Sequence, residues 1–165
     1  HCVDLGCGTG LMAQALGGRA RRNTGIDLSG AMLKKAEDKK LYDKLIKADL
    51  TAGMLEAGPA DLIIGADVFM YLGALAPVIS ASHAHLLPGG IFAFSVELSK
   101  AVGGYELLAS MRHAHSAAYV GKCLAASGFE TLATKISIIR TDGPDTIDGL
   151  LTIARKPFER MNADG

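Results

Sequence analysis

Short apolar segments alternate with helical segments along nearly the whole chain, and this alternation restricts the possible folds more than any other feature. The pattern is typical of β-α-β units, in which helices cover a largely parallel sheet. Strands are predicted at residues 1–5, 24–27, 44–47, 61–65, 91–96, 131–139 and 149–155. Helices are predicted at residues 10–16, 30–39, 75–87 and 116–127.

The end of the chain departs from this alternation. Only the turn Asp142-Gly143-Pro144-Asp145 separates the last two predicted strands, and strands joined this closely pair antiparallel. Elsewhere, Ser29 is predicted to cap the second helix, Gly128 to end the last one, and Pro88-Gly89-Gly90 to form a turn before the fifth strand. We therefore predict an α/β, Rossmann-like, doubly wound and mostly parallel seven-stranded sheet with a C-terminal antiparallel hairpin.

Composition limits the number of domains and the kinds of partner. The 165 residues, of which 49% are hydrophobic, suit one domain with one core, predicted over residues 1–156 and followed by a polar tail at 157–165. Seventeen Lys and Arg residues balance seventeen Asp and Glu residues, so the formal charge is zero. A neutral chain has no bulk attraction to nucleic acid or to an anionic membrane, and neither is expected as a partner.

Cysteine usage and the beginning of the chain bear on its context. Cys2, Cys7 and Cys123 form no C-x-x-C pair and are predicted to be free thiols, which indicates a cytoplasmic protein. The sequence contains neither a run of eighteen apolar residues nor a basic and then apolar leader. It starts inside a predicted buried strand, as natural domains seldom do, so we expect that an upstream segment has been removed.

A glycine-rich loop, Gly6-Cys7-Gly8-Thr9-Gly10, follows the first predicted strand. It lies at the carboxyl edge of the sheet, where open α/β sheets bind ligands, and glycine there permits a tight turn and close approach of a ligand. Taken alone, such a loop also occurs as a plain turn between a strand and a helix. The next strand ends at Asp27, whose carboxylate suits the two ribose hydroxyls of an adenosine, although an acid there also stabilises the start of a helix. Together they predict an adenosine site.

Details of the loop favour a cationic cofactor over a dinucleotide. The dinucleotide pattern G-x-G-x-x-G requires a third glycine where this chain has Leu11; its third glycine is Gly10. Asp4 stands two residues before the first glycine. A carboxylate repels a pyrophosphate and attracts a cation, which counts against a nicotinamide oxidoreductase.

Several motifs, in order, resemble those of the class I S-adenosylmethionine-dependent methyltransferases. The first is VDLGCGTG at 3–10, the second GIDLS at 25–29 and the third KADL at 47–50. DLIIGADVFMYL at 61–72 is similar to the fourth strand and its loop, LLPGGIFAFSVE at 86–97 to the following strand, and GFE at 128–130 with GLLTIARKP at 149–157 to the last hairpin. The stretch from Tyr105 through Arg112-His113-Ala114-His115-Ser116 resembles bacterial methyltransferases that carry tetratricopeptide repeats upstream.

The resemblance implies S-adenosylmethionine as cofactor, S-adenosylhomocysteine as product, and methyl transfer by in-line displacement. Because the sulfonium already activates the methyl group, the protein mainly has to position and dehydrate the reactants. The third motif is implied to contact the adenine. The predicted cofactor-binding residues are Asp4, Gly6, Cys7, Gly8, Gly10, Asp27, Leu28, Ala48, Asp49, Leu50, Ala66 and Asp67.

Candidates for a general base come from the later loops. His113 and His115 are predicted because imidazole titrates near neutral pH and because both follow a glycine-bearing segment that can close over a substrate; a surface or capping role is the alternative. Glu97, at the end of the fifth strand, is interpreted as solvated. Three residues after the fourth strand are equally consistent with the donor pocket and with the core: Phe69, Met70 and Tyr71.

Absent motifs narrow the acceptor. After the fourth strand the chain has Ala66-Asp67-Val68-Phe69, where the family's base-methylating members carry (N/D)-P-P-(Y/F) or Pro-Cys. The sequence shows no basic groove and no cluster with metal-ligand spacing, so no metal site is predicted. A small molecule is the expected acceptor by elimination. The alternative is a protein methyltransferase, or a non-catalytic cofactor-binding assembly factor, recruited through an upstream repeat domain.

Overall fold

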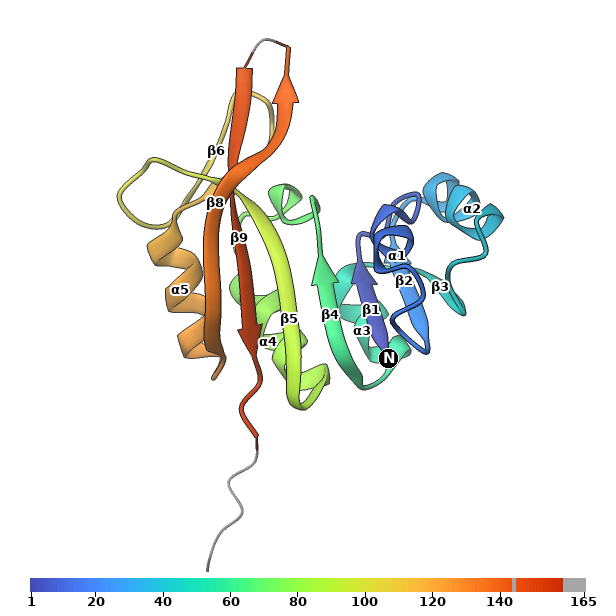
Figure 1. Cartoon of the computed structure of the whole chain (residues 1–165). Helices are drawn as coiled ribbons and strands as arrows, with labels where there is room; N and C mark the ends of the chain where they lie inside the picture. The colour runs from blue at the N-terminus through green and yellow to red at the C-terminus, as the bar shows by residue number, and fades with distance from the viewer. Residues whose placement is uncertain (144, 159–165) are drawn as a thin grey trace, which may run out of the picture.

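The computed structural model describes residues 1–143 and 145–158, and its strands and helices alternate along the chain (Figure 1). The strands are β1 (Cys2–Leu5), β2 (Asn23–Asp27), β3 (Lys44–Lys47), β4 (Ala60–Gly65), β5 (Leu86–Leu98), β6 (Tyr105–Leu107), β7 (His113–His115), β8 (Glu130–Asp142) and β9 (Asp145–Arg155). The helices are α1 (Leu11–Leu16), α2 (Gly30–Asp38), α3 (Leu50–Ala57), α4 (Ala76–His85) and α5 (Ala117–Ala126), with the 3-10 turn η1 (Phe69–Tyr71).

The strands form one sheet in the order β3-β2-β1-β4-β5-β7-β6, with β9 also paired to β5 and β8 to β9. Strands β1 to β5 are parallel, and β8 and β9 form an antiparallel hairpin. This confirms the predicted Rossmann-like fold and its C-terminal hairpin. Strands β2 and β3 are added on one side of β1, and β4 and β5 on the other. The boundary between β1 and β4 is therefore the topological switch point, at which sheets of this kind bind ligands.

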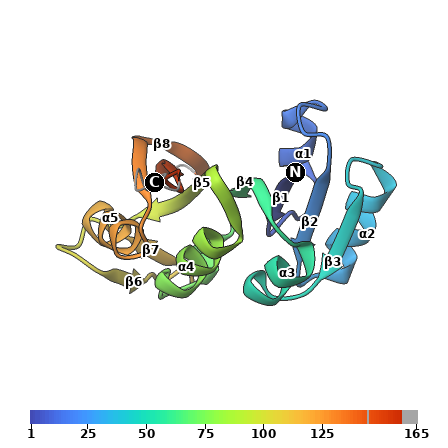
Figure 2. The same ribbon diagram turned by 90° about the horizontal axis from the view of Figure 1, so that it is seen from below.

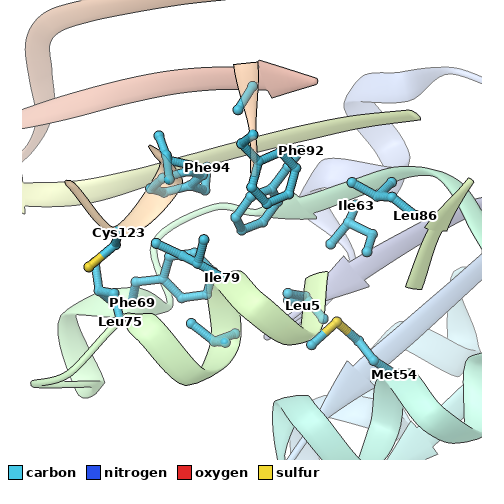
Figure 3. Packing of buried hydrophobic residues seen from close by; sticks show 14 of the residues in the cluster. Leu5, Met54, Ile63, Phe69, Leu75, Ile79, Leu86, Phe92, Phe94 and Cys123 are labelled. Carbon is cyan, nitrogen blue, oxygen red and sulfur yellow. The ribbon is translucent and has the colours of Figure 1, made fainter. Parts of the chain in front are cut away.

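Helices cover the two faces of the sheet unequally. Figure 2 shows α3, α4 and α5 along one face and α1 on the other. The main core fills the space between the sheet and α3–α5, where Phe92 and Phe94 stack with ring centroids 4.6 Å apart (Figure 3). Val3 and Leu5 of β1 belong to this core. Because side chains alternate along a strand, Asp4 points to the opposite face, where α1 lies.

Three elements go beyond the sequence prediction, so the described sheet has nine strands and not seven. Helix α3 packs Met54 into the core and brings Gly53 against β2; no helix was predicted there, and only its first residue, Leu50, belongs to the KADL motif. Strands β6 and β7 have three residues each, too few to show an alternating pattern. They form because they pair with each other and because β7 pairs with the end of β5.

The predicted boundaries are mostly correct. Ser29 caps α2 by accepting a hydrogen bond from Met32 N at 3.3 Å, and Gly128 follows α5 with a φ of +83°. The turn predicted before the fifth strand is wrong, because Pro88-Gly89-Gly90 is a bulge within β5, where the register with β4 shifts. Pro144 of the predicted hairpin turn and residues 159–165 of the predicted tail lie outside the described residues. No helix in the described ranges is long and apolar enough to cross a membrane.

Candidate functional site

Three carboxylates mark the edge of the sheet at which β1, β2 and β3 end. Asp4 is the penultimate residue of β1, Asp27 is the last residue of β2, and Asp49 follows β3 as the cap of α3. Parallel strands bring their carboxyl ends to one edge, so the fold gathers these three acids although the sequence separates them. Of the three, Asp4 stands on β1, one of the two strands at the switch point.

The glycine loop between β1 and α1 has a backbone that favours glycine. The φ angles of Gly6, Gly8 and Gly10 are +65°, +52° and +85°. A Cβ atom on Gly6 would lie 2.3 Å from Val68 Cγ2, and a Cβ atom on Gly8 would meet only the carbonyl oxygen of Gly6, at 4.0 Å. Gly6 thus allows Val68 to pack closely against the loop. At Gly8, by contrast, the space that a side chain would fill is open, and we call this space beside Gly8 the open cradle. An adenosine cofactor fits such a cradle.

Asp27 fastens the glycine loop to the start of α2. Its Oδ2 accepts a hydrogen bond from Gly8 N at 2.9 Å, and its Oδ1 accepts one from Ser29 N at 2.8 Å. Each carboxylate oxygen has a further lone pair, so the group can still accept from two ribose hydroxyls. Both interpretations of Asp27, as a helix-start acid and as a ligand acid, are compatible with this geometry. The next residue, Leu28, is exposed beside it.

Asp49 begins α3 and remains exposed. Its Oδ1 accepts hydrogen bonds from the backbone N atoms of Thr51 and Ala52, both at 3.0 Å. The Thr51 hydroxyl and the Ala52 N–H lower the pKa of Asp49, which keeps it ionised. Its neighbours Ala48 and Leu50 are half-buried against the core. A ligand can reach the carboxylate, and the cap fixes its position.

Asp4 is a buried acid with only 3% of its surface exposed. Burial raises its pKa to about 6, a hydrogen bond from Tyr42 Oη to its Oδ2 at 2.6 Å opposes that rise, and the charge of Asp27 adds to it. Near neutral pH the carboxylate is therefore ionised at a cost, and a cationic ligand offsets that cost. Sequence analysis did not identify Tyr42, which lies 38 residues from Asp4 in a polar loop without an apolar pattern.

Cys7 lies within the glycine loop, and its side chain is buried against β2. Its thiol is free and buried, and its Sγ would lie 2.8 Å from a Cβ atom on Gly25 of β2. Burial raises the pKa of Cys7 to about 12, so the group stays a neutral thiol. With only 6% of its surface exposed, Cys7 offers a ligand little side-chain contact.

The loop after β4 is fastened to β5 and β8. Asp67 N donates to Ser95 Oγ at 3.1 Å, and its Oδ1 lies 3.4 Å from Arg140 Nη1. Arg140 also pairs with Glu97, which is 5% exposed, so the interpretation of Glu97 as solvated is wrong. Sequence analysis missed Ser95 and Arg140, because the partners of Arg140 stand 43 and 73 residues away.

The two predicted general bases lie on β7, where His115 packs against α5 and His113 against β6. His115 is fully buried; its Nε2 bonds to the carbonyl oxygen of Gly73 at 2.9 Å, and its ring stacks on Tyr119. Burial lowers the pKa of His115, which favours the neutral ring. These contacts favour a structural role for His115. His113 is half-buried and forms a T-shaped ring pair with Tyr105, and its general-base role stays a prediction.

The residues after β4 divide between core and surface. Phe69 and Met70 are buried in the core, whereas Tyr71 is 65% exposed. In the described part of the chain no three His, Cys, Asp or Glu side chains form a group able to hold a metal ion.

An apolar groove of about 480 Å³ lies beside the site. It extends from α1 across β4 and β5 to the hairpin of β8 and β9. Ala66, a predicted cofactor-binding residue, is one of the residues that line it. The residues that bound it include Met12, Ile64, Ala66, Ser95, Leu151 and Ile153. The groove therefore adjoins the loop that follows β4.

Comparison with known proteins identifies the family. Residues 3–94 match the family described as "Methyltransferase domain". The chain belongs to this methyltransferase family. It is 35% identical over 99 residues to trans-aconitate 2-methyltransferase of Paracidovorax citrulli, covering 58% of this chain and 38% of that protein. It is 31% identical over 93 residues to malonyl-[acyl-carrier protein] O-methyltransferase of Salmonella typhimurium, covering 56% and 37%. The methyltransferase chain thus spans little more than a third of these relatives.

Solved structures share the fold. The S-adenosylmethionine-dependent methyltransferase from Mesorhizobium loti has a TM-score of 0.71 and 22% identity, covering 94% of this chain and 90% of that one. Magnesium protoporphyrin IX methyltransferase from Synechocystis, with bound S-adenosylmethionine, has a TM-score of 0.72 and 20% identity, covering 94% and 69%. The predicted methyltransferase family is confirmed, and the solved structures share its fold. The tetratricopeptide-associated subgroup and the individual ligand contacts stay predictions.

Proposed function

We propose that this methyltransferase transfers the methyl group of S-adenosylmethionine to a small-molecule acceptor by in-line displacement. The observation that carries the proposal is the groove of about 480 Å³ that adjoins Ala66. Its volume lies within the range of about 300–1,000 Å³ found for small-molecule sites. The relative from Paracidovorax citrulli is named for trans-aconitate, a small molecule, which supports the same class of acceptor.

Each residue of the proposed site binds a different part of the cofactor. S-adenosylmethionine, when bound, supplies a methyl group activated by the positive sulfonium. Asp4 attracts the cationic amino acid end, the backbone at Gly8 admits the cofactor, Asp27 accepts the ribose hydroxyls and Asp49 accepts from the adenine amino group. Positioning and exclusion of water are then the main contributions of the protein.

Titration calorimetry with S-adenosylhomocysteine tests the donor site, and absence of binding would refute the proposal. Incubation with methyl-labelled S-adenosylmethionine and a size-fractionated cell extract tests the acceptor. We expect label in the small-molecule fraction, and no label there with an Asp27→Ala variant as control. Label confined to polypeptides would instead indicate a protein methyltransferase, and binding without transfer a cofactor-binding assembly factor.

A further inference from the structure

Tyr42 lies in the segment between α2 and β3, outside every motif that resembles the family, yet it contacts two parts of the site. Its hydroxyl donates to Asp4 Oδ2 at 2.6 Å. Its ring edge passes close to the backbone of Gly10 and of Gly25: a Cβ atom on either glycine would lie 3.1 Å from a ring carbon. Glycine at both positions therefore leaves a slot for the ring, and the slot fixes the direction of the hydroxyl.

The surroundings of Asp4 make this hydrogen bond important. The titratable groups that face its carboxylate are Asp27 from β2, Cys2 from β1, Cys7 from the glycine loop, and Tyr42 itself. None of these is a cation, and Asp4 forms no ion pair with the described residues. Burial raises the pKa of the Tyr42 hydroxyl, so it stays protonated and remains a donor. The hydroxyl of Tyr42 is thus the side chain that stabilises the ionised form.

We infer that Tyr42 is a positioning residue of the cofactor site, which holds the Asp4 carboxylate in place and in its charged form to receive the cationic end of the methyl donor. This inference rests on the proposed assignment of the glycine loop to the donor. A protonated Asp4 would not attract an ammonium group, so the hydroxyl of Tyr42 extends cofactor binding to lower pH.

A Tyr42→Phe variant tests the role, because it keeps the ring in its slot and removes only the hydroxyl. The first measurement is the pKa of Asp4 in the cofactor-free protein, followed by carboxyl-carbon NMR. We expect it to rise by about one pH unit, since a charge-assisted hydrogen bond of ordinary strength corresponds to roughly a tenfold change in equilibrium. The second measurement is the affinity for S-adenosylhomocysteine between pH 5.5 and 8.5. The midpoint at which affinity falls with decreasing pH should shift upward by the same amount.

Tyr119→Phe is the matched control. Its hydroxyl accepts a hydrogen bond from Leu75 N at 3.0 Å, in a part of the molecule that does not contact Asp4, so this variant should lose stability without a change in either titration. An unchanged Asp4 pKa in Tyr42→Phe, or a loss of affinity equal at every pH, would overturn the inference. If the wild-type chain failed to bind S-adenosylhomocysteine, the proposed function would fail and this role with it. In that case the Tyr42→Phe variant would still shift the pKa of Asp4, although neither protein bound S-adenosylhomocysteine. This result would separate failure of the proposed function from failure of the contact between Tyr42 and Asp4.

Discussion

Replacing Asp4 by asparagine tests two effects of its buried charge: the loss of folding stability and the gain in affinity for the cofactor. Asp4→Asn substitutes a neutral amide of nearly the same shape for a carboxylate that is 3% exposed. The amide oxygen can still accept the hydrogen bond from Tyr42. We expect the variant to be more stable than the wild-type chain at pH 8 and to bind S-adenosylhomocysteine more weakly.

The magnitude follows from the pKa of Asp4, which burial raises from 3.8 to about 6. This rise corresponds to about 3 kcal/mol of unfolding free energy. Because the folded pKa is above the unfolded one, the wild-type chain loses this stability as the pH rises from about 4 to about 6. At pH 4 the carboxyl is protonated in the folded protein and nearly half protonated in the unfolded chain, so the variant should have little advantage there. The gap should therefore grow from near zero to about 3 kcal/mol.

Urea denaturation of both proteins without cofactor, at pH 4 and at pH 8, measures this gap. Glu37→Gln on α2 is the control, because this carboxylate is exposed and its neutralisation should change stability little at either pH. The reasoning is refuted if Asp4→Asn is no more stable than the wild-type chain at pH 8. A gap of the same size at both pH values would refute it as well, because ionisation would then not be its cause.

Three further substitutions test the loop and the ion pair. Gly6→Ala should destabilise the fold by about 1–3 kcal/mol through its clash with Val68, in addition to the ~1–2 kcal/mol that its positive φ costs. Val68→Ala removes the contact with Cγ2 but keeps a Cβ atom at 2.6 Å, so it should recover only part of the loss in thermal denaturation. Gly8→Ala, whose Cβ would enter the open cradle, should weaken binding of S-adenosylhomocysteine at least about tenfold in calorimetry, while the positive φ costs only ~1–2 kcal/mol; unchanged affinity contradicts the cradle. Arg140→Ala leaves the buried Glu97 unpaired and should cost about 3–5 kcal/mol in urea denaturation, and adding Glu97→Gln should restore most of it.

Features whose cause lies within a few residues were predictable from the sequence. The strand at Lys44–Lys47 agrees with its prediction, and Ser29 identifies the start of α2, because apolar spacing and a capping side chain act locally. The glycine loop and Asp27 were predictable for a related reason. The left-handed backbone of the loop requires glycine at three positions, and the acid stands at the end of the next strand, so both can be recognised by residue type and spacing.

Features that depend on distant partners were not predictable. The burial of Glu97 follows from Arg140, which lies on another strand 43 residues later, and a glutamate at a strand end looks solvated without that partner. The position of His115 is similar: its burial depends on Tyr119 and on the carbonyl oxygen of Gly73, which is 42 residues away. The contact between Tyr42 and Asp4 was not predictable either, because it depends on the folded arrangement of β1 and β2.

The same burial that makes Asp4 costly gives the site its selectivity for charge. A cation that binds the ionised carboxylate must, by reciprocity of linked equilibria, raise the acid dissociation constant of Asp4 by the same factor by which ionisation raises its affinity. Asp27 raises the pKa of Asp4 further, and neither carboxylate forms an ion pair with the residues that the structure describes. An arginine or lysine side chain there would relieve the repulsion and would also occupy the place of the ligand. Above pH 6 the free protein instead retains an unfavourable charge at Asp4, which a positively charged ligand would neutralise.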